Sequence, residues 1–200
     1  MEMIALLSSA YFAPVQWYQK LYRYPQVRVE HCDSYQKQTY RNRCVIASAN
    51  GPQALTVPVF VENSTAKISD HGNWRHIHWQ ALTSAYGDSP FFDYYEDDLR
   101  PFFTERWERL YDYNEAICRK MCELLDIQPN VVATTDYLSH ADCDGIDDFR
   151  DTIHPKHPQD DPQFVPRRYY QVYEQRHGFL PNLSILDMLF NMGPESVFYL

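Results

Sequence analysis

The first thirty residues constrain the fold of this chain most, because they alternate between strand and helix patterns. The short apolar run Ile4–Ser9 predicts a buried strand. Pro14 can open a helix over Val15–Tyr24, in which large side chains recur at helical spacing, and Pro25 ends it. Residues 27–30 alternate in polarity, which predicts a second strand. A strand, a helix and a strand in this order begin an α/β domain.

A β-hairpin is predicted a little further along the chain. Two apolar runs are separated by Asn50-Gly51, which favours the positive φ of a tight turn. We expect strands near residues 41–47 and 54–60, with the turn between them. Arg41 and Arg43 are two residues apart, so on a strand they would point to the same face.

These cations are candidates for an anion-binding surface. Because ligands of α/β domains bind beyond the carboxyl ends of the strands, residues 8–11 and 31–37 are expected at one edge of the sheet. Lys37, Arg41 and Arg43 would then present ammonium and guanidinium groups near that edge. Solvated charges on an exposed strand face are the alternative interpretation.

The rest of the chain continues with both strand and helix patterns. We expect strands at 65–69, 131–134 and 169–173 and helices at 74–86, 107–125 and 184–191. Ser184 and Asp187 match a capping box at the start of the last helix, and Gly193 is the expected residue after its end. The predicted fold is a single α/β domain over residues 1–200, with a mixed sheet of about five strands, flanking helices, an inserted β-hairpin and a long acidic loop.

The acidic loop is Ser139–Pro166, which contains seven Asp and four Pro. Loops of this length are usually lids, binding loops or disordered segments. Within it, His154 and Lys156 form a compact basic patch that could close over an anion, with Lys as the charge and His as a donor or proton shuttle. A loop whose charges are simply hydrated is the alternative.

Composition narrows the class of function. The net charge of −9 and the absence of a dense basic face argue against a nucleic-acid binder. The apolar run Met3–Ala13 is shorter than the roughly 20 residues of a membrane span, and with no basic segment before it we expect a cytoplasmic protein. Five cysteines, an odd number, agree with a reducing compartment. The sixteen tyrosines could form a surface for a protein partner.

Neither a metal nor a cofactor is predicted. Cys118 and Cys122 share a helix face, but they match no standard zinc spacing and are expected in the core. His76 and His78 would point about 200° apart on a helix, so they could not share a metal ion. No phosphate-binding glycine motif and no nucleophile motif is present in the sequence.

Four blocks of sequence, found in a fixed order along most of the chain, carry a resemblance to a known family. They are Tyr11-Phe12-x-Pro14; Asp33-x3-Lys37-Gln38-x-Tyr40-x-Asn42-Arg43 with Leu55-Thr56-Val57-Pro58-Val59; Trp79, Tyr86 and Pro90-Phe91-Phe92; and Leu183-Ser184-Ile185-Leu186-Asp187-x-Leu189-x-Asn191-x-Gly193. In these blocks the chain resembles the WbqC-like family. The family often has His-Gln-Pro where this chain has Ser8-Ser9-Ala10.

The resemblance implies a transferase of cell-surface, O-antigen-like polysaccharide assembly, which moves glycine, an acyl group or a glycosyl group from an anionic activated donor. Asp33, as general base, and Lys37 are the catalytic candidates. In the alternative interpretation, Asp33 simply forms an ion pair with Lys37. The candidates for binding the substrate are Tyr11, Tyr40, Arg41, Asn42, Arg43, His154 and Lys156. The alternative is a non-catalytic binding or scaffold protein of the same machinery, which the missing His-Gln favours.

Overall fold

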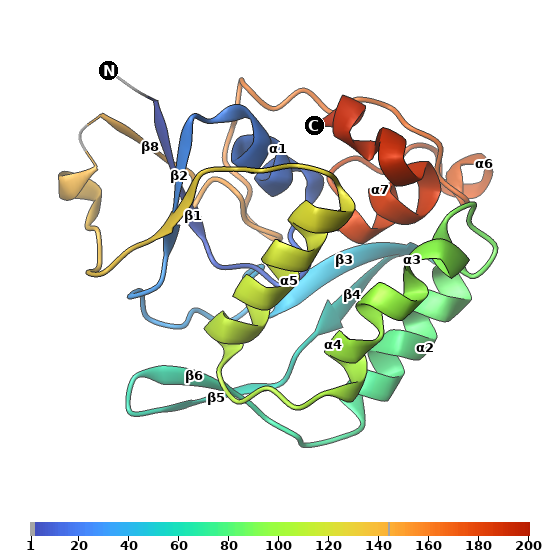
Figure 1. Ribbon diagram of the computed structural model, residues 1–200, viewed down its shortest axis with the longest axis horizontal. Helices are drawn as coiled ribbons and strands as arrows, with labels where there is room; N and C mark the ends of the chain where they lie inside the picture. Colours follow the sequence, from blue (N-terminus) through green and yellow to red (C-terminus); the bar gives the residue numbers. More distant parts are fainter. Residues whose placement is uncertain (1–2, 144) are drawn as a thin grey trace.

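A parallel sheet of four strands organises the molecule (Figure 1). The computed structural model describes residues 3–143 and 145–200. The sheet contains β1 (Ile4–Ser8), β2 (Gln26–Glu30), β7 (Val131–Ala133) and β8 (Ile146–Asp148), in the order β7-β2-β1-β8. Because β2 and β7 extend the sheet to one side of β1 and β8 lies on the other, the strand order reverses at β1. Ligands of such sheets bind at the carboxyl ends beside this reversal.

Two helices, α1 (Val15–Arg23) and α5 (Leu110–Leu124), lie against the same face of the sheet. The register pairs Ala5 with Val27 and Val27 with Val131, which places small and branched side chains on this face. Burial and the neighbouring Cys118 thiol of α5 raise the pKa of Tyr18 in α1, so the two helices lie side by side here. The strand-helix-strand unit predicted for the first thirty residues is therefore formed as β1-α1-β2.

An insertion between β2 and β7 contains two hairpins and three helices besides α5 (Figure 1). In the first hairpin Asn50 lies in the turn and Gly51 has φ +106°, a conformation that glycine adopts without strain. The hairpins are β3 (Arg43–Ser48) with β4 (Gly51–Thr56), and β5 (Val59–Glu62) with β6 (Thr65–Ile68). The helices are α2 (Trp74–Tyr86), α3 (Phe92–Leu99) and α4 (Pro101–Thr104).

The C-terminal segment contains a buried helix, α7 (Ile185–Met192), in which all residues from Ile185 to Asn191 are buried. It joins the β3 hairpin through the backbone, since the N–H of Ser184 donates to the carbonyl of Val45 at 2.7 Å. Gly193 follows the helix with φ +54°, and a Cβ there would lie 2.6 Å from Phe91, so only glycine fits. The remaining short helices are η1 (His140–Asp142), α6 (Glu174–His177) and η2 (Gly193–Tyr199).

The capping box predicted for α7 is formed only in part. The Ser184 hydroxyl accepts from the N–H of Leu186, as a cap does. The Asp187 carboxylate instead lies in the core, where it accepts hydrogen bonds from the hydroxyls of Tyr86 and Tyr169 at 2.9 and 2.7 Å. The capping role assigned to Asp187 is therefore wrong, because three buried donors, the third being the amide of Gln171, compete for its oxygens.

The predicted α/β class with flanking helices and an inserted hairpin is confirmed. The antiparallel strands form two separate two-stranded sheets, so the main sheet contains four strands and all are parallel. The strand expected at 169–173 is wrong, although its side chains alternate between buried and exposed. The polar atoms of Tyr169 and Gln171 bond to Asp187, and the segment pairs with no strand among the described residues.

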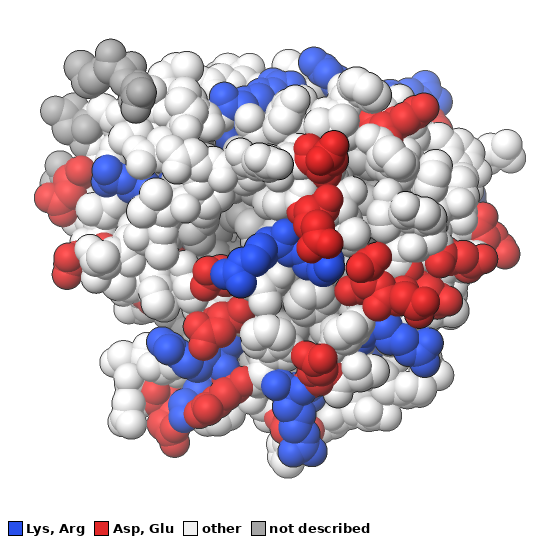
Figure 2. Space-filling model, viewed as in Figure 1, with Lys and Arg blue, Asp and Glu red and all other residues white. Residues whose placement is uncertain are grey.

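The acidic loop contains ordered structure, since β8 lies within it and pairs with β1. Asp144, another residue of this loop, lies outside the described residues. On the face shown in Figure 2, Lys and Arg are interspersed with Asp and Glu and form no continuous basic surface. In the part of the chain that is described, none of the helices combines the length and the apolar composition of a membrane span.

Candidate functional site

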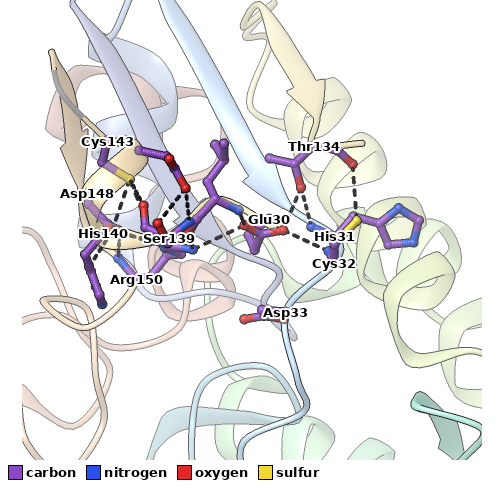
Figure 3. Close-up of polar contacts among 12 residues, drawn as sticks. Glu30, His31, Cys32, Asp33, Thr134, Ser139, His140, Cys143, Asp148 and Arg150 are labelled. Carbon is purple, nitrogen blue, oxygen red and sulfur yellow. Dashed lines mark hydrogen bonds and ion pairs between the residues drawn. The ribbon is translucent and has the colours of Figure 1, made fainter. Parts of the chain in front are cut away.

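The carboxyl ends of β2, β7 and β8 are joined around Glu30, the last residue of β2. Its carboxylate accepts hydrogen bonds from the backbone N–H groups of Cys32 and Leu138, at 2.8 and 3.1 Å. It also accepts from the hydroxyl of Thr134 at 2.7 Å, and Thr134 directly follows β7 (Figure 3). The side chain of Glu30 has no exposed surface. Glu30 therefore fixes the ends of two neighbouring strands from inside the protein.

Arg150 adds a third strand to this network, because it lies two residues after β8. Its Nη1 donates to Glu30 at 3.2 Å and to the carbonyl of Leu138 at 2.7 Å. Its Nε and Nη2 donate to the two carboxylate oxygens of Asp148, at 2.9 and 2.7 Å (Figure 3). Burial tends to raise the pKa of Asp148, but the hydrogen bonds and charge of Arg150 outweigh it, and the pKa is lowered. We call Glu30, Asp148 and Arg150 the strand-end network.

Two pockets open at this edge of the sheet. One, which we call the rim pocket, has a volume of about 410 Å³ and is lined by residues that include Cys32, His140 and Arg150. The other, the hairpin pocket, has a volume of about 100 Å³ and lies between the strand ends and the β5–β6 hairpin. Asp33 and Arg41 line both pockets. This pair therefore lies where the two pockets meet.

The geometry of the pair leaves one part of each side chain available. Nε of Arg41 donates to Oδ2 of Asp33 at 3.0 Å, and Nη2 contacts the same oxygen. Among the described residues, Oδ1 of Asp33 accepts no hydrogen bond and Nη1 of Arg41 donates none. Arg41 is only 7 % exposed, so its guanidinium is held by the protein rather than by solvent. A carboxylate fixed through one oxygen can accept a proton with the other, and the free N–H groups of Arg41 can bind an anion.

The sequence predicted that Arg41 and Arg43 share one face of a strand, and this prediction is wrong. β3 begins at Arg43, and Arg41 lies before it in a turn, where its side chain is drawn inward by Asp33. Arg43 donates across the hairpin to the hydroxyl of Thr56 at 3.2 Å. Lys37 is exposed in the same turn as Arg41. Neither Lys37 nor Arg43 lines the rim pocket or the hairpin pocket, so only one of the three predicted cations reaches them.

Two of the predicted binding residues lie in the core. Tyr11 has no exposed surface, and its hydroxyl is 2.9 Å from Nδ1 of His78. Asn42 is buried and donates to the carbonyl of Val57 at 2.7 Å. The polar atoms of Tyr11 and Asn42 thus bond to the scaffold, and their role in binding a substrate stays a prediction. Tyr40 is half-buried, and burial raises its pKa to about 12.

The basic patch of the acidic loop lies beside the Lys37–Arg41 turn. Nζ of Lys156 donates to the side chain of Gln38 at 2.6 Å. Nδ1 of His154 accepts from the backbone N–H groups of Lys156 and His157, at 3.1 and 3.0 Å, so this ring stabilises its own turn. Neither His154 nor Lys156 lines the two pockets.

The sequence analysis missed Glu30, Arg150 and Arg109. Arg109 precedes α5 and lines the hairpin pocket with Arg41. The one available signal for Glu30 was its position, since a carboxylate at the end of a strand lies at the edge where ligands bind. Arg150 gave no signal, because it is surrounded by carboxylates in a segment that appeared to be a loop. Among the described residues, no three His, Cys, Asp or Glu side chains are arranged to hold a metal ion.

Reversed strand order with pockets at the carboxyl ends defines an α/β protein with a ligand-sized cleft at one edge of its sheet. Residues 9–152 and 159–199 match the WbqC-like protein family, and the chain belongs to this family. It is similar to Rv1507c, an uncharacterized protein of Mycobacterium tuberculosis (strain ATCC 25618 / H37Rv), with 27% identity over 227 residues that cover 100% of this chain and 98% of the relative. No solved structure matches the chain significantly.

Proposed function

We propose that this protein is a transferase of cell-surface polysaccharide assembly that binds an anionic, activated donor at the carboxyl edge of the sheet. The observation that carries the proposal is the position of the Asp33–Arg41 pair, which lines two adjoining pockets and keeps an oxygen and N–H groups available. The polysaccharide context comes from the WbqC-like family, whose resemblance to this chain includes the motif that begins at Asp33.

In the proposed reaction, Arg41 binds the phosphate or carboxylate of the donor through its free N–H groups. Arg109, which is about half exposed and lines the hairpin pocket, provides a second guanidinium. Oδ1 of Asp33 removes the proton from the attacking hydroxyl or amine of the acceptor as its lone pair forms the new bond. The leaving group takes the electron pair of the broken bond and departs as an anion stabilised by Arg41.

Thermal unfolding with a panel of nucleotide sugars and acyl thioesters tests this proposal. A donor present at about 100 times its dissociation constant should stabilise the fold by about 2.7 kcal/mol, which raises the Tm by about 5–11 °C for a chain of this size. Arg41→Ala and Arg109→Ala should each remove most of the shift. Arg43→Ala is the matched control, because this guanidinium is two residues from Arg41 and outside both pockets.

The catalytic role of Asp33 is tested separately. Asp33→Asn keeps the shape of the side chain and an oxygen for Arg41, so donor binding should persist while transfer is lost. Binding without turnover in the wild-type protein would support a binding protein rather than a transferase. If no member of the panel raises the Tm, or if Arg43→Ala abolishes the shift as fully as Arg41→Ala, the proposed donor site is wrong.

A further inference from the structure

A groove with a volume of about 470 Å³ lies between α5 and the face of the sheet that α1 also covers. Its sheet wall contains Val29, Val131 and Ala133, which the strand register places on one face. Figure 2 shows the surface hollowed between α5 and the β2–β7 edge. We call this feature the helix groove; most of the residues that line it are apolar, and the charged residues Glu115, Arg119 and Glu123 line it as well.

The α5 wall of the groove is a regular stripe. Tyr111, Asn114, Cys118 and Cys122 line it, and on a helix these positions fall within about 80° of one another. The eleven residue steps from Tyr111 to Cys122 correspond to a length of about 17 Å. A groove of this length with a volume of about 470 Å³ has room for an extended hydrocarbon chain that lies along α5.

One end of the groove meets the proposed donor site. Ser9 and Tyr111 line both the helix groove and the hairpin pocket. Nδ2 of Asn114 donates to the hydroxyl oxygen of Ser9 at 3.0 Å and to the carbonyl of Arg41 at 2.8 Å. The carbonyl of Arg41 can only accept a hydrogen bond, so the Asn114 amide must be oriented with its NH₂ group toward it. The Ser9 hydroxyl oxygen therefore accepts its hydrogen bond from the same NH₂ group. The hydroxyl hydrogen of Ser9 is not donated to any described residue, so it is free to bond to the carbonyl of a ligand.

We infer that the helix groove binds the hydrocarbon chain of an acyl group, with the acyl carbonyl at Ser9 and the anionic part of the molecule in the hairpin pocket. This inference deepens the proposed function, because it identifies the transferred group as an acyl group. It rests on the proposed function for the orientation of the ligand, whose anionic part would face the donor site. A zigzag chain with bonds of about 1.5 Å rises about 1.25 Å per carbon, so a length of about 17 Å accepts about 13 carbons.

A chain-length series of N-acylglycines tests the inference, because these compounds combine an acyl chain, a carbonyl and a carboxylate. Isothermal titration calorimetry of the full chain should show the affinity rising about fourfold per methylene, since each buried methylene contributes about 0.8 kcal/mol. The rise should stop near 13 carbons. Ser9→Ala should weaken every member about 2- to 12-fold and leave the slope per methylene unchanged.

Two variants locate the chain. Cys122→Trp and Val131→Trp narrow the far end of the groove from opposite walls, so each should shorten the chain at which affinity stops rising and leave the hexanoyl compound unaffected. Ile77→Trp is the matched control, since Ile77 is an exposed residue of α2 that does not line the groove. If one blocking variant does not fold, the other gives the same measurement.

Affinity that does not change with chain length would overturn the inference, as would blocking variants that weaken short and long compounds equally. The two proposals can fail separately. If the affinity of the N-acylglycines rises with chain length but no compound of the nucleotide-sugar and thioester panel raises the Tm, the groove assignment stands and the donor site is rejected. If a donor raises the Tm through Arg41 but affinity does not depend on chain length, only the acyl group is rejected.

Discussion

Replacing Arg150 with methionine tests whether the strand-end network holds the carboxyl edge together. Methionine keeps most of the side-chain volume but removes the four hydrogen bonds to Glu30, Asp148 and the carbonyl of Leu138. Glu30 would then be a carboxylate with no exposed surface and no cation beside it. Breaking one partner out of a buried ion pair costs about 3–5 kcal/mol, against a total stability of about 5–15 kcal/mol for a typical domain.

Urea unfolding at pH 7 measures this loss as the difference in the free energy of unfolding. A loss of about 3–5 kcal/mol lowers the Tm by about 6–20 °C in a chain of this size. Adding Glu30→Gln to Arg150→Met should cost about 1–3 kcal/mol less than the sum of the single changes, because the second substitution removes the charge that the first left unpaired.

A surface ion pair provides the control. Arg119 and Glu115 form an i, i+4 pair on α5 at 2.9 Å with both side chains largely exposed, so Arg119→Met should cost less than about 0.5 kcal/mol. Should Arg150→Met cost no more than Arg119→Met, the strand-end network would contribute nothing to stability, and the reasoning that connects β2, β7 and β8 through Glu30 would be refuted.

Two further predictions concern buried groups in the core. Burial lowers the pKa of His78 to about 4, whereas its value in the unfolded chain is about 6.5. The unfolded chain therefore binds a proton first as pH falls, and the free energy of unfolding should drop by about 3 kcal/mol between pH 6.5 and pH 4. His78→Gln should make the free energy of unfolding less dependent on pH in this range. Burial raises the pKa of Asp187, so the folded protein keeps its proton to higher pH than the unfolded chain, and the contribution of this group falls as pH rises above 3.8. Tyr169→Phe removes the hydrogen bond from the Tyr169 hydroxyl to Asp187 and should cost about 1–3 kcal/mol in urea unfolding at pH 7; a variant as stable as the wild-type protein would show that this bond does not stabilise the core.

The elements that were predicted well depend on local chemistry. Pro14 and Pro25 mark the ends of a helix that the structure places at Val15–Arg23, and Asn50-Gly51 forms the turn of the β3–β4 hairpin. These signals come from φ preferences and side-chain spacing, which act within a few residues. The α/β class followed from them, because a strand, a helix and a strand leave few ways to bury their apolar faces.

The strand order and most of the site depend on contacts between distant residues, and the sequence carried little sign of them. β8 is three residues long and has one apolar residue, Ile146, so neither length nor alternation distinguished it from the acidic loop. Its pairing with β1 is made by backbone hydrogen bonds, which any sequence can form. Arg150 reaches Glu30 only because of that pairing, and a guanidinium 120 residues from its partner has no spacing to reveal it.

The buried residues of the WbqC-like motif explain why Arg41 is held in position although it lies outside a strand. The carbonyl of Tyr40 accepts from the N–H of Tyr11, that of Asn42 accepts from the N–H of Val57, and that of Arg41 accepts from Asn114. Three consecutive carbonyls are thus fixed by separate parts of the fold. A guanidinium on such a backbone loses little conformational freedom when an anion binds, and this preorganisation favours affinity. The motif residues that lie outside the pockets therefore support the proposed site by fixing the backbone of Arg41.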